Sequence, residues 1–261
     1  MTTSMKTSKD LDYRKVLSLR TDNPKVDDPT YGFWWEHIKE NPLMISYPRT
    51  GAHWINAVIE LYFDRPRLPA RRATFLDPSR DDWGWFHDHD TIAWDKLHLE
   101  NNNDLGVLYL YRNPVPTIFS WIVYNFNKGQ SLRHLAPEKL ETFVVAVAQQ
   151  YRDHLTKWLI DTENTTAIRY ENFQDKPVGE LFKVFNTHFK KQAHDFDEER
   201  AQACFDIVTP VELSKRRTEW KTLSDFMLTD EYKKDRSVFA EKYSDLINSI
   251  VITEDLKEFF E

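Results

Sequence analysis

Short apolar runs alternate with amphipathic segments along much of the chain. The first run, residues 43–47, is bounded by Pro42 and Pro48 and predicts a buried strand. A tight turn follows, and the apolar positions of residues 54–62 then recur at helical spacing. The pattern of strand, turn and helix predicts a first βα unit.

The same alternation continues toward the C-terminus. Further strands are predicted at 106–111 and 165–170, and helices after Arg112-Asn113-Pro114 and at 137–159, 178–189 and 198–205. This order favours an α/β fold with a central parallel sheet flanked by helices. The irregular stretch 64–105 is long enough to be functional. No repeat or linker interrupts the pattern, so we predict a single domain over 1–261, with a loose lead-in over 1–30.

Composition narrows the class of protein. The net charge of −7 argues against a general nucleic-acid binder, although a few well-placed cations can still hold an anionic ligand. Cys204 is the sole cysteine, so no intrachain disulfide can form. Neither a signal core nor a run of about 18 apolar residues is present, which predicts a cytoplasmic protein without a membrane segment.

The turn after the first strand has the features of an anion site. Backbone amides and the helix dipole favour an anion between a strand and its helix. Gly51 lets the backbone approach closely, Arg49 supplies a permanent charge, and Thr50 supplies a hydroxyl. The G-x-x-x-x-G-K-[ST] spacing of nucleotide triphosphatases is missing. Alone, the segment also fits an ordinary turn with a surface arginine.

A second cation and hydroxyl follow the next strand. Arg112 ends that strand, and Ser120 lies two turns into the following helix. Ligands of open α/β sheets bind at the carboxyl ends of strands, so both side chains are expected to face the same crevice and to hold a second phosphate. Read alone, Arg-Asn-Pro is also a common turn sequence.

Together the two segments resemble the cytosolic-type sulfotransferase family. Ser46–Trp54 is similar to that family's T-Y-P-K-S-G-T-T-W loop, Arg112–Ser120 to its R-N-P-x-x-x-x-x-S element, and Arg169–Phe173 to its Y-E-D segment. The likeness runs from about Pro42 to Phe189. It implies a P-loop-like sulfotransferase fold, 3′-phosphoadenosine 5′-phosphosulfate (PAPS) as donor, adenosine 3′,5′-bisphosphate (PAP) as product, a small-molecule acceptor and no required metal.

The resemblance also implies roles for individual residues. Arg49 stands at the bridging oxygen of the sulfate, where the family has lysine. Thr50 and Gly51 hold the 5′-phosphate, Arg112 and Ser120 the 3′-phosphate, and Trp54 and Tyr170 contact the adenine. The basic run Lys215-Arg216-Arg217 is the counterpart of a stretch that completes the 3′-phosphate site, or else it is a solvated basic patch.

Three departures of the loop from the family pattern bear on its chemistry. Arg49 keeps the charge of lysine but cannot give up a proton near neutrality, so its role is electrostatic. Ala52 and His53 replace two threonines at the nucleotide. His53 either donates to a phosphate oxygen or caps the turn.

A histidine is the expected general base, because it takes protons near neutral pH. The family places its base in the loop before the Arg-Asn-Pro strand, where Phe86–Asp90 lies; His89 is preferred, His87 is the reserve, and His98 is less favoured. The alternative is that these histidines are surface loop residues. The His-x-His pair lacks a third metal ligand at convincing spacing.

The acceptor and two rival functions stay open. Trp85, His87 and Asp88 are candidate acceptor contacts, and the interleaved acidic and aromatic residues suit a cationic or guanidinium-bearing molecule, or else form a solvated acidic loop around a few buried tryptophans. A neutral alcohol, phenol or sugar is the other candidate acceptor. A non-catalytic nucleotide-binding protein and a nucleotide-dependent kinase are the rivals, and the sequence leaves O- or N-sulfation and the oligomeric state undecided.

Overall fold

The computed structural model describes residues 43–63, 68–69, 86–89, 107–125, 131–186, 195–209 and 226–261. The chain divides into two compact units that alternate along the sequence. The first unit comprises Met1–Ser46, Ala52–Leu110 and Asn164–Thr209, and the second comprises Tyr47–Gly51, Tyr111–Glu163 and Pro210–Glu261. Because each unit consists of separate segments, the single-domain assignment stays a prediction.

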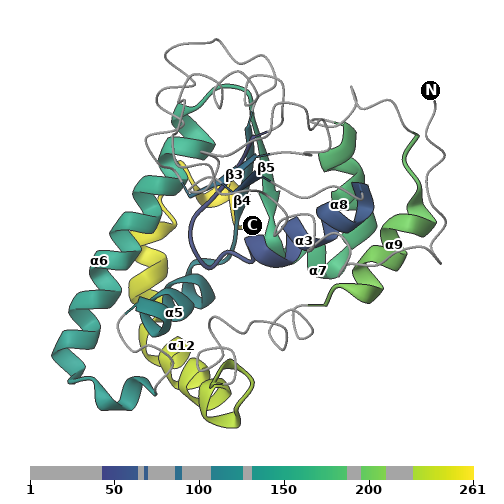
Figure 1. Cartoon of the computed structure of the whole chain (residues 1–261). Helices are drawn as coiled ribbons and strands as arrows, with labels where there is room; N and C mark the ends of the chain where they lie inside the picture. Colours follow the sequence, from purple (N-terminus) through teal and green to yellow (C-terminus); the bar gives the residue numbers. More distant parts are fainter. Residues whose placement is uncertain are drawn as a thin grey trace, which may run out of the picture. The chain divides into compact units, whose positions relative to one another are not determined.

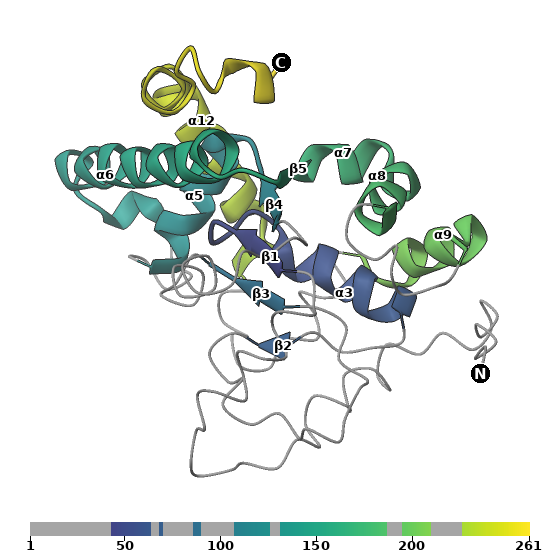
Figure 2. The ribbon, with the colours of Figure 1, turned by 90° about the horizontal axis from the view of Figure 1, so that it is seen from above.

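Within the described ranges, five strands form one sheet, in the order β2-β3-β1-β4-β5 (Figure 2). They are β1 (Leu43–Ser46), β2 (Leu68–Pro69), β3 (Phe86–Asp88), β4 (Val107–Tyr111) and β5 (Thr165–Arg169). β1 pairs in parallel with both β3 and β4, and β2 pairs in parallel with β3. Every residue of β4 is buried, as expected of a central parallel strand. The predicted parallel α/β sheet is confirmed.

The described helices of the first unit are α3 (Ala52–Phe63), α7 (Tyr170–Asp175), α8 (Pro177–Val184) and α9 (Glu198–Ile207). α3 is buried along nearly its whole length, and α9 packs against both α3 and α8 (Figure 1). The guanidinium of buried Arg200 donates to the carbonyls of Leu61 (3.2 Å) and Tyr62 (2.7 Å). Arg200 therefore caps the C-terminal end of α3, where the carbonyls have no helical partner.

The second unit is built on α5 (Pro114–Asn125), α6 (Pro137–Thr156) and α12 (Asp230–Val251), which pack pairwise against one another (Figure 1). A 3₁₀ turn over Leu132–His134 precedes α6, a π-helical turn over Lys157–Asp161 follows it, and a 3₁₀ turn over Lys257–Phe259 lies near the C-terminus. Buried Asp235 of α12 accepts from the Ser131 hydroxyl (2.6 Å) and from Nε of Arg133 (3.0 Å). These bonds fix the 3₁₀ turn that precedes α6 to α12.

Most predicted elements are confirmed to within a few residues, but β2, β3, α7 and α12 were missed. The short strands β2 and β3 lie inside the stretch 64–105, which was predicted to be irregular. The two residues of β2, and the three of β3 that include His87 and Asp88, give no apolar run. The helix α12 is largely polar, and its buried positions (232, 235, 239, 243, 247 and 251) follow a helical period that was overlooked. The helix α7 has only six residues. The predicted lead-in over 1–30 lies outside the described residues.

Candidate active site

The turn after β1 has an unusual backbone. Arg49 adopts a φ of 75° and Gly51 a φ of 95°. The left-handed region suits glycine but costs an L-residue about 1–2 kcal/mol. The Thr50 hydroxyl donates to the carbonyl of Tyr47 at 2.8 Å and so closes the turn. The strained conformation at Arg49 is typical of a functional position.

The Arg49 side chain is held by contacts within the second unit, to which Arg49 itself belongs. Its Nε donates to the hydroxyl of Ser120 at 3.0 Å and its Nη2 to the sulfur of Met227 at 3.4 Å. The guanidinium also lies over the ring of Tyr124, 5.2 Å from the ring centroid. Burial lowers the pKa of Arg49, and Arg112 lowers it further, while Tyr232 and Tyr124 act in the opposite sense. Arginine stays protonated at neutral pH in any case, so this group is a fixed positive charge.

Arg112 comes to the same place from the end of β4. Its Nη1 donates to the carbonyl of Arg49 at 3.5 Å. Its backbone N–H donates to the hydroxyl of Tyr151 at 3.0 Å, and that hydroxyl donates to the Arg112 carbonyl at 2.6 Å. The second unit therefore brings Arg49, Arg112 and Ser120 together, as the two turns predict. We call these three residues the phosphate cluster.

The two residues expected at the adenine meet within the first unit. The rings of Trp54 and Tyr170 are 5.6 Å apart in an edge-to-face contact, and Phe205 of α9 lies 5.8 Å from Trp54. The indole N–H of Trp54 donates to the carbonyl of Val208 at 2.6 Å, which fixes the ring plane. We call Trp54, Tyr170 and Phe205 the aromatic cluster.

The candidate bases His87 and His89 converge on Ser46 at the end of β1. Nε2 of His87 lies 2.9 Å from the Ser46 hydroxyl, and Nδ1 of His89 lies 2.7 Å from the Ser46 carbonyl. A carbonyl only accepts, so His89 carries a proton on Nδ1, and its neutral form has a lone pair on Nε2. His87 is buried and His89 is half-buried. His89 is therefore the more accessible of the two.

The sulfotransferase domain model matches residues 39–225, more than half of the chain. The chain belongs to the sulfotransferase domain family. Among solved structures it is similar to mouse sulfotransferase SULT7A1 complexed with PAP, with a TM-score of 0.58 and 15% identity over 88% of this chain and 94% of that one. At that identity the likeness establishes the fold. None of the curated proteins matches the chain in sequence.

The other predicted site residues of this sulfotransferase-family chain fall in different places. Ala52 is buried and His53 is exposed in the first turn of α3. Trp85, His98 and Lys215-Arg216-Arg217 lie outside the described residues, as does the side chain of Asp88. No group of three or more His, Cys, Asp or Glu side chains suited to a metal ion occurs in the described part of this sulfotransferase-family chain.

Sequence reasoning missed Tyr151, Met227 and Phe205 as neighbours of the site. Tyr151 lies on the apolar face of α6, and a tyrosine there signals a hydroxyl that needs a buried partner. Met227 is 178 residues from Arg49, and no local pattern links the two. Phe205 follows the helical period of α9 and reads as an ordinary core residue.

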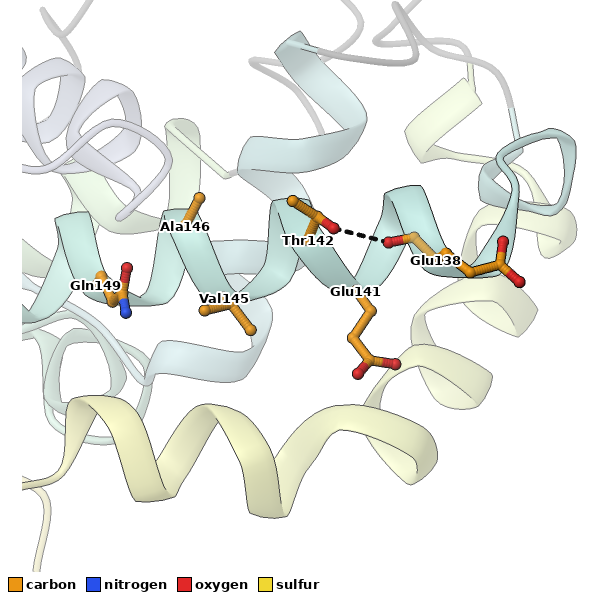
Figure 3. Close-up of a pocket in the computed structure, with 6 residues that line it drawn as sticks. All are labelled: Glu138, Glu141, Thr142, Val145, Ala146 and Gln149. Carbon is orange, nitrogen blue, oxygen red and sulfur yellow. Dashed lines mark hydrogen bonds between the residues drawn. The ribbon is translucent and has the colours of Figure 1, made fainter.

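A shallow hollow on α6 contains none of the candidate site residues. It is lined by Glu138, Glu141, Thr142, Val145, Ala146 and Gln149. Figure 3 shows these side chains along one helix, where the Thr142 hydroxyl donates to the Glu138 carbonyl at 2.9 Å. The two carboxylates repel an anionic nucleotide, so we assign this hollow no part in the site. No helix among the described ranges is both long and apolar enough to cross a membrane.

Proposed function

We propose that this protein transfers a sulfuryl group from PAPS to a hydroxyl or amine of a small-molecule acceptor. The phosphate cluster is the observation that carries the proposal. Two turns, after β1 and β4, bring two guanidinium groups and one hydroxyl together in the second unit. Two permanent cations held side by side repel each other, and an anion with more than one charge relieves that repulsion.

The proposal divides the phosphate cluster between the two phosphate ends of the nucleotide. Arg112 and the hydroxyl of Ser120 bind the 3′-phosphate. Arg49 binds at the 5′-phosphosulfate, with the loop amides of Thr50 and Gly51. The Thr50 hydroxyl already donates to the Tyr47 carbonyl, so we assign Thr50 a backbone role.

The aromatic cluster is proposed to hold the adenine. Trp54 and Tyr170 offer π-faces and edges, and stacking of a base on an aromatic ring contributes about 1–3 kcal/mol. The hydrogen bond from Trp54 to Val208 fixes the plane of the indole, so its side chain loses little entropy when a base binds.

His89 is proposed as the general base. PAPS supplies an activated sulfuryl group whose leaving group is a phosphate. Nε2 of His89 takes the acceptor proton as the acceptor atom bonds to sulfur and the sulfur–oxygen bond to the 5′-phosphate breaks. Arg49 compensates the charge that develops on that phosphate, and no proton donor is needed there. The hydrogen bond from Nδ1 to the Ser46 carbonyl fixes the required tautomer.

For the acceptor we keep two candidate classes. Trp85, His87 and Asp88 lie next to the base in sequence, and a carboxylate beside aromatic residues favours a cationic or guanidinium-bearing acceptor. A neutral alcohol, phenol or sugar is the second class. Competition between cationic and neutral acceptors separates them, and indifference to acceptor charge would contradict the cationic class.

A turnover assay tests the proposal. Purified protein is incubated with labelled PAPS and an acceptor library, and product and PAP are measured. We expect turnover that falls by about 10²–10³-fold in Arg49→Ala. The control Arg152→Ala removes an exposed arginine that pairs with Asp153 and should leave turnover unchanged. Tight PAP binding without turnover would favour the non-catalytic alternative, and absence of both would contradict the proposal.

A further inference from the structure

The hydroxyl of Tyr151 in α6 forms hydrogen bonds with both backbone groups of Arg112, its N–H and its C=O. The hydroxyl accepts the Arg112 N–H at 3.0 Å and donates to the Arg112 carbonyl at 2.6 Å. Tyr151 is completely buried. Arg112 follows the last residue of β4, and the side chain of Tyr151 provides its backbone groups with partners inside the protein.

The ring of Tyr151 contacts the other phosphate-binding turn. It packs against Tyr47 with 4.8 Å between ring centroids and an interplanar angle of 44°. Tyr47 in turn accepts the hydrogen bond from Thr50 that closes the turn. His154, one helical turn further along α6, also contacts Tyr47, in an edge-on arrangement with 5.3 Å between the ring centroids. One side chain therefore touches the turn that carries Arg49 and the turn that carries Arg112.

We propose that Tyr151 is a positioning residue for the 3′-phosphate site. Its hydroxyl fixes the peptide groups on both sides of Arg112. It thereby fixes the position and direction in which the Arg112 side chain leaves the backbone. Without the hydroxyl, the partly buried N–H and C=O of Arg112 lose this partner and the chain at Arg112 relaxes. This inference rests on the proposed function, because it assumes that Arg112 binds the 3′-phosphate.

The test is calorimetric titration of Tyr151→Phe with two nucleotides. Phenylalanine keeps the ring contact with Tyr47 and removes only the hydroxyl. We expect the affinity for PAP to fall about tenfold and the affinity for adenosine 5′-phosphate, which lacks the 3′-phosphate, to change less than twofold. If Tyr151 merely filled the core, the substitution would lower the affinity for both nucleotides equally.

The matched control is Tyr62→Phe. The hydroxyl of Tyr62 also bonds to a backbone group, accepting from the N–H of Asp197 at 2.9 Å, but Tyr62 lies near the end of α3 in the first unit and belongs to neither phosphate turn. We expect both affinities of this variant to equal those of the wild type. Tyr151→Phe in an Arg112→Ala background should cause no further loss of PAP affinity, because the two changes act through the same contact.

Three results of these titrations would overturn the positioning role. They are an equal loss of affinity for both nucleotides, an unchanged affinity for PAP, and additive losses of PAP affinity in the double variant. A wild type that binds no PAP would end the proposed function, and this inference with it. If Tyr151→Phe does not fold, hydrogen exchange on the wild type replaces it: a protected Arg112 amide supports the inference, and rapid exchange without ligand overturns it.

Discussion

The Nε–H of Arg49 donates to the hydroxyl of Ser120 at 3.0 Å, although 71 residues separate them in sequence. One residue lies in the turn after β1 and the other lies in the helix after β4. This hydrogen bond therefore joins the turn after β1 to α5 within the second unit. Donors that the fold holds in place lose little entropy when an anion binds.

The backbone of Arg49 gives the first prediction, which concerns stability. At a φ of 75°, glycine is relaxed and alanine is strained. Arg49→Gly and Arg49→Ala lose the same side-chain contacts, so the difference between them isolates the backbone. We expect the glycine variant to be more stable by about 1 kcal/mol, or about 2–4 °C in Tm by calorimetry. Equal Tm values would contradict a left-handed Arg49.

The two histidines at Ser46 should differ in their effect on turnover. We expect His89→Ala to lower kcat by about 10²–10⁴-fold, the range typical of a lost general base. His87→Ala removes a buried ring whose Nε2 lies 2.9 Å from the Ser46 hydroxyl. We expect it to lower the Tm, and to lower kcat less than His89→Ala does. Steady-state kinetics with a saturating acceptor, together with thermal unfolding, separates the two. Near-normal kcat in His89→Ala would remove it from the role.

Trp54 is expected to report on adenine binding alone. Trp54→Leu should lower the affinity for PAP by about 10–100-fold, because the stacking surface is lost. The affinity for inorganic pyrophosphate, which has no base, should stay within a factor of two. Phe185→Leu is the control, since Phe185 is buried in the same unit among Tyr62, Phe63 and Phe196 rather than at Trp54. Equal losses for both ligands would contradict an adenine role.

Cys204 provides a probe of unfolding. Cys204 is completely buried, and this desolvation raises the pKa of its thiol to about 12. The native protein should therefore not react with a thiol reagent at about pH 8, while the denatured chain, whose thiol has an ordinary pKa of about 8.5, should release one equivalent. The protonated thiol favours the native state, and this contribution declines as the pH rises above about 8.5 toward the folded pKa. Rapid labelling of the native protein would contradict this burial.

Local patterns predicted the strands and turns that carry the phosphate cluster. An apolar run between prolines and a following helical period are enough to place a βα turn, and Arg49, Gly51 and Arg112 stand at the turns by sequence alone. Placing both turns at strand ends then follows from the rule for parallel sheets. The family resemblance supplied the assignment of each turn to a phosphate.

Contacts between distant segments could not be predicted in this way. Tyr151 bonds to a residue 39 positions earlier, and Met227 meets Arg49 across 178 positions. Neither partner is implied by periodicity, because packing of α5, α6 and α12 decides which side chains meet. The left-handed φ of Arg49 was equally unforeseen, since an L-residue there is unfavourable locally and is held by its surroundings.

A crystal structure of the protein with PAP tests the central claim most directly. The account predicts the Arg49 guanidinium within about 2.7–3.2 Å of a 5′-phosphate oxygen, and the Arg112 guanidinium with the Ser120 hydroxyl at the same range from the 3′-phosphate. A nucleotide bound elsewhere, or bound with either guanidinium turned away from its phosphates, would contradict it.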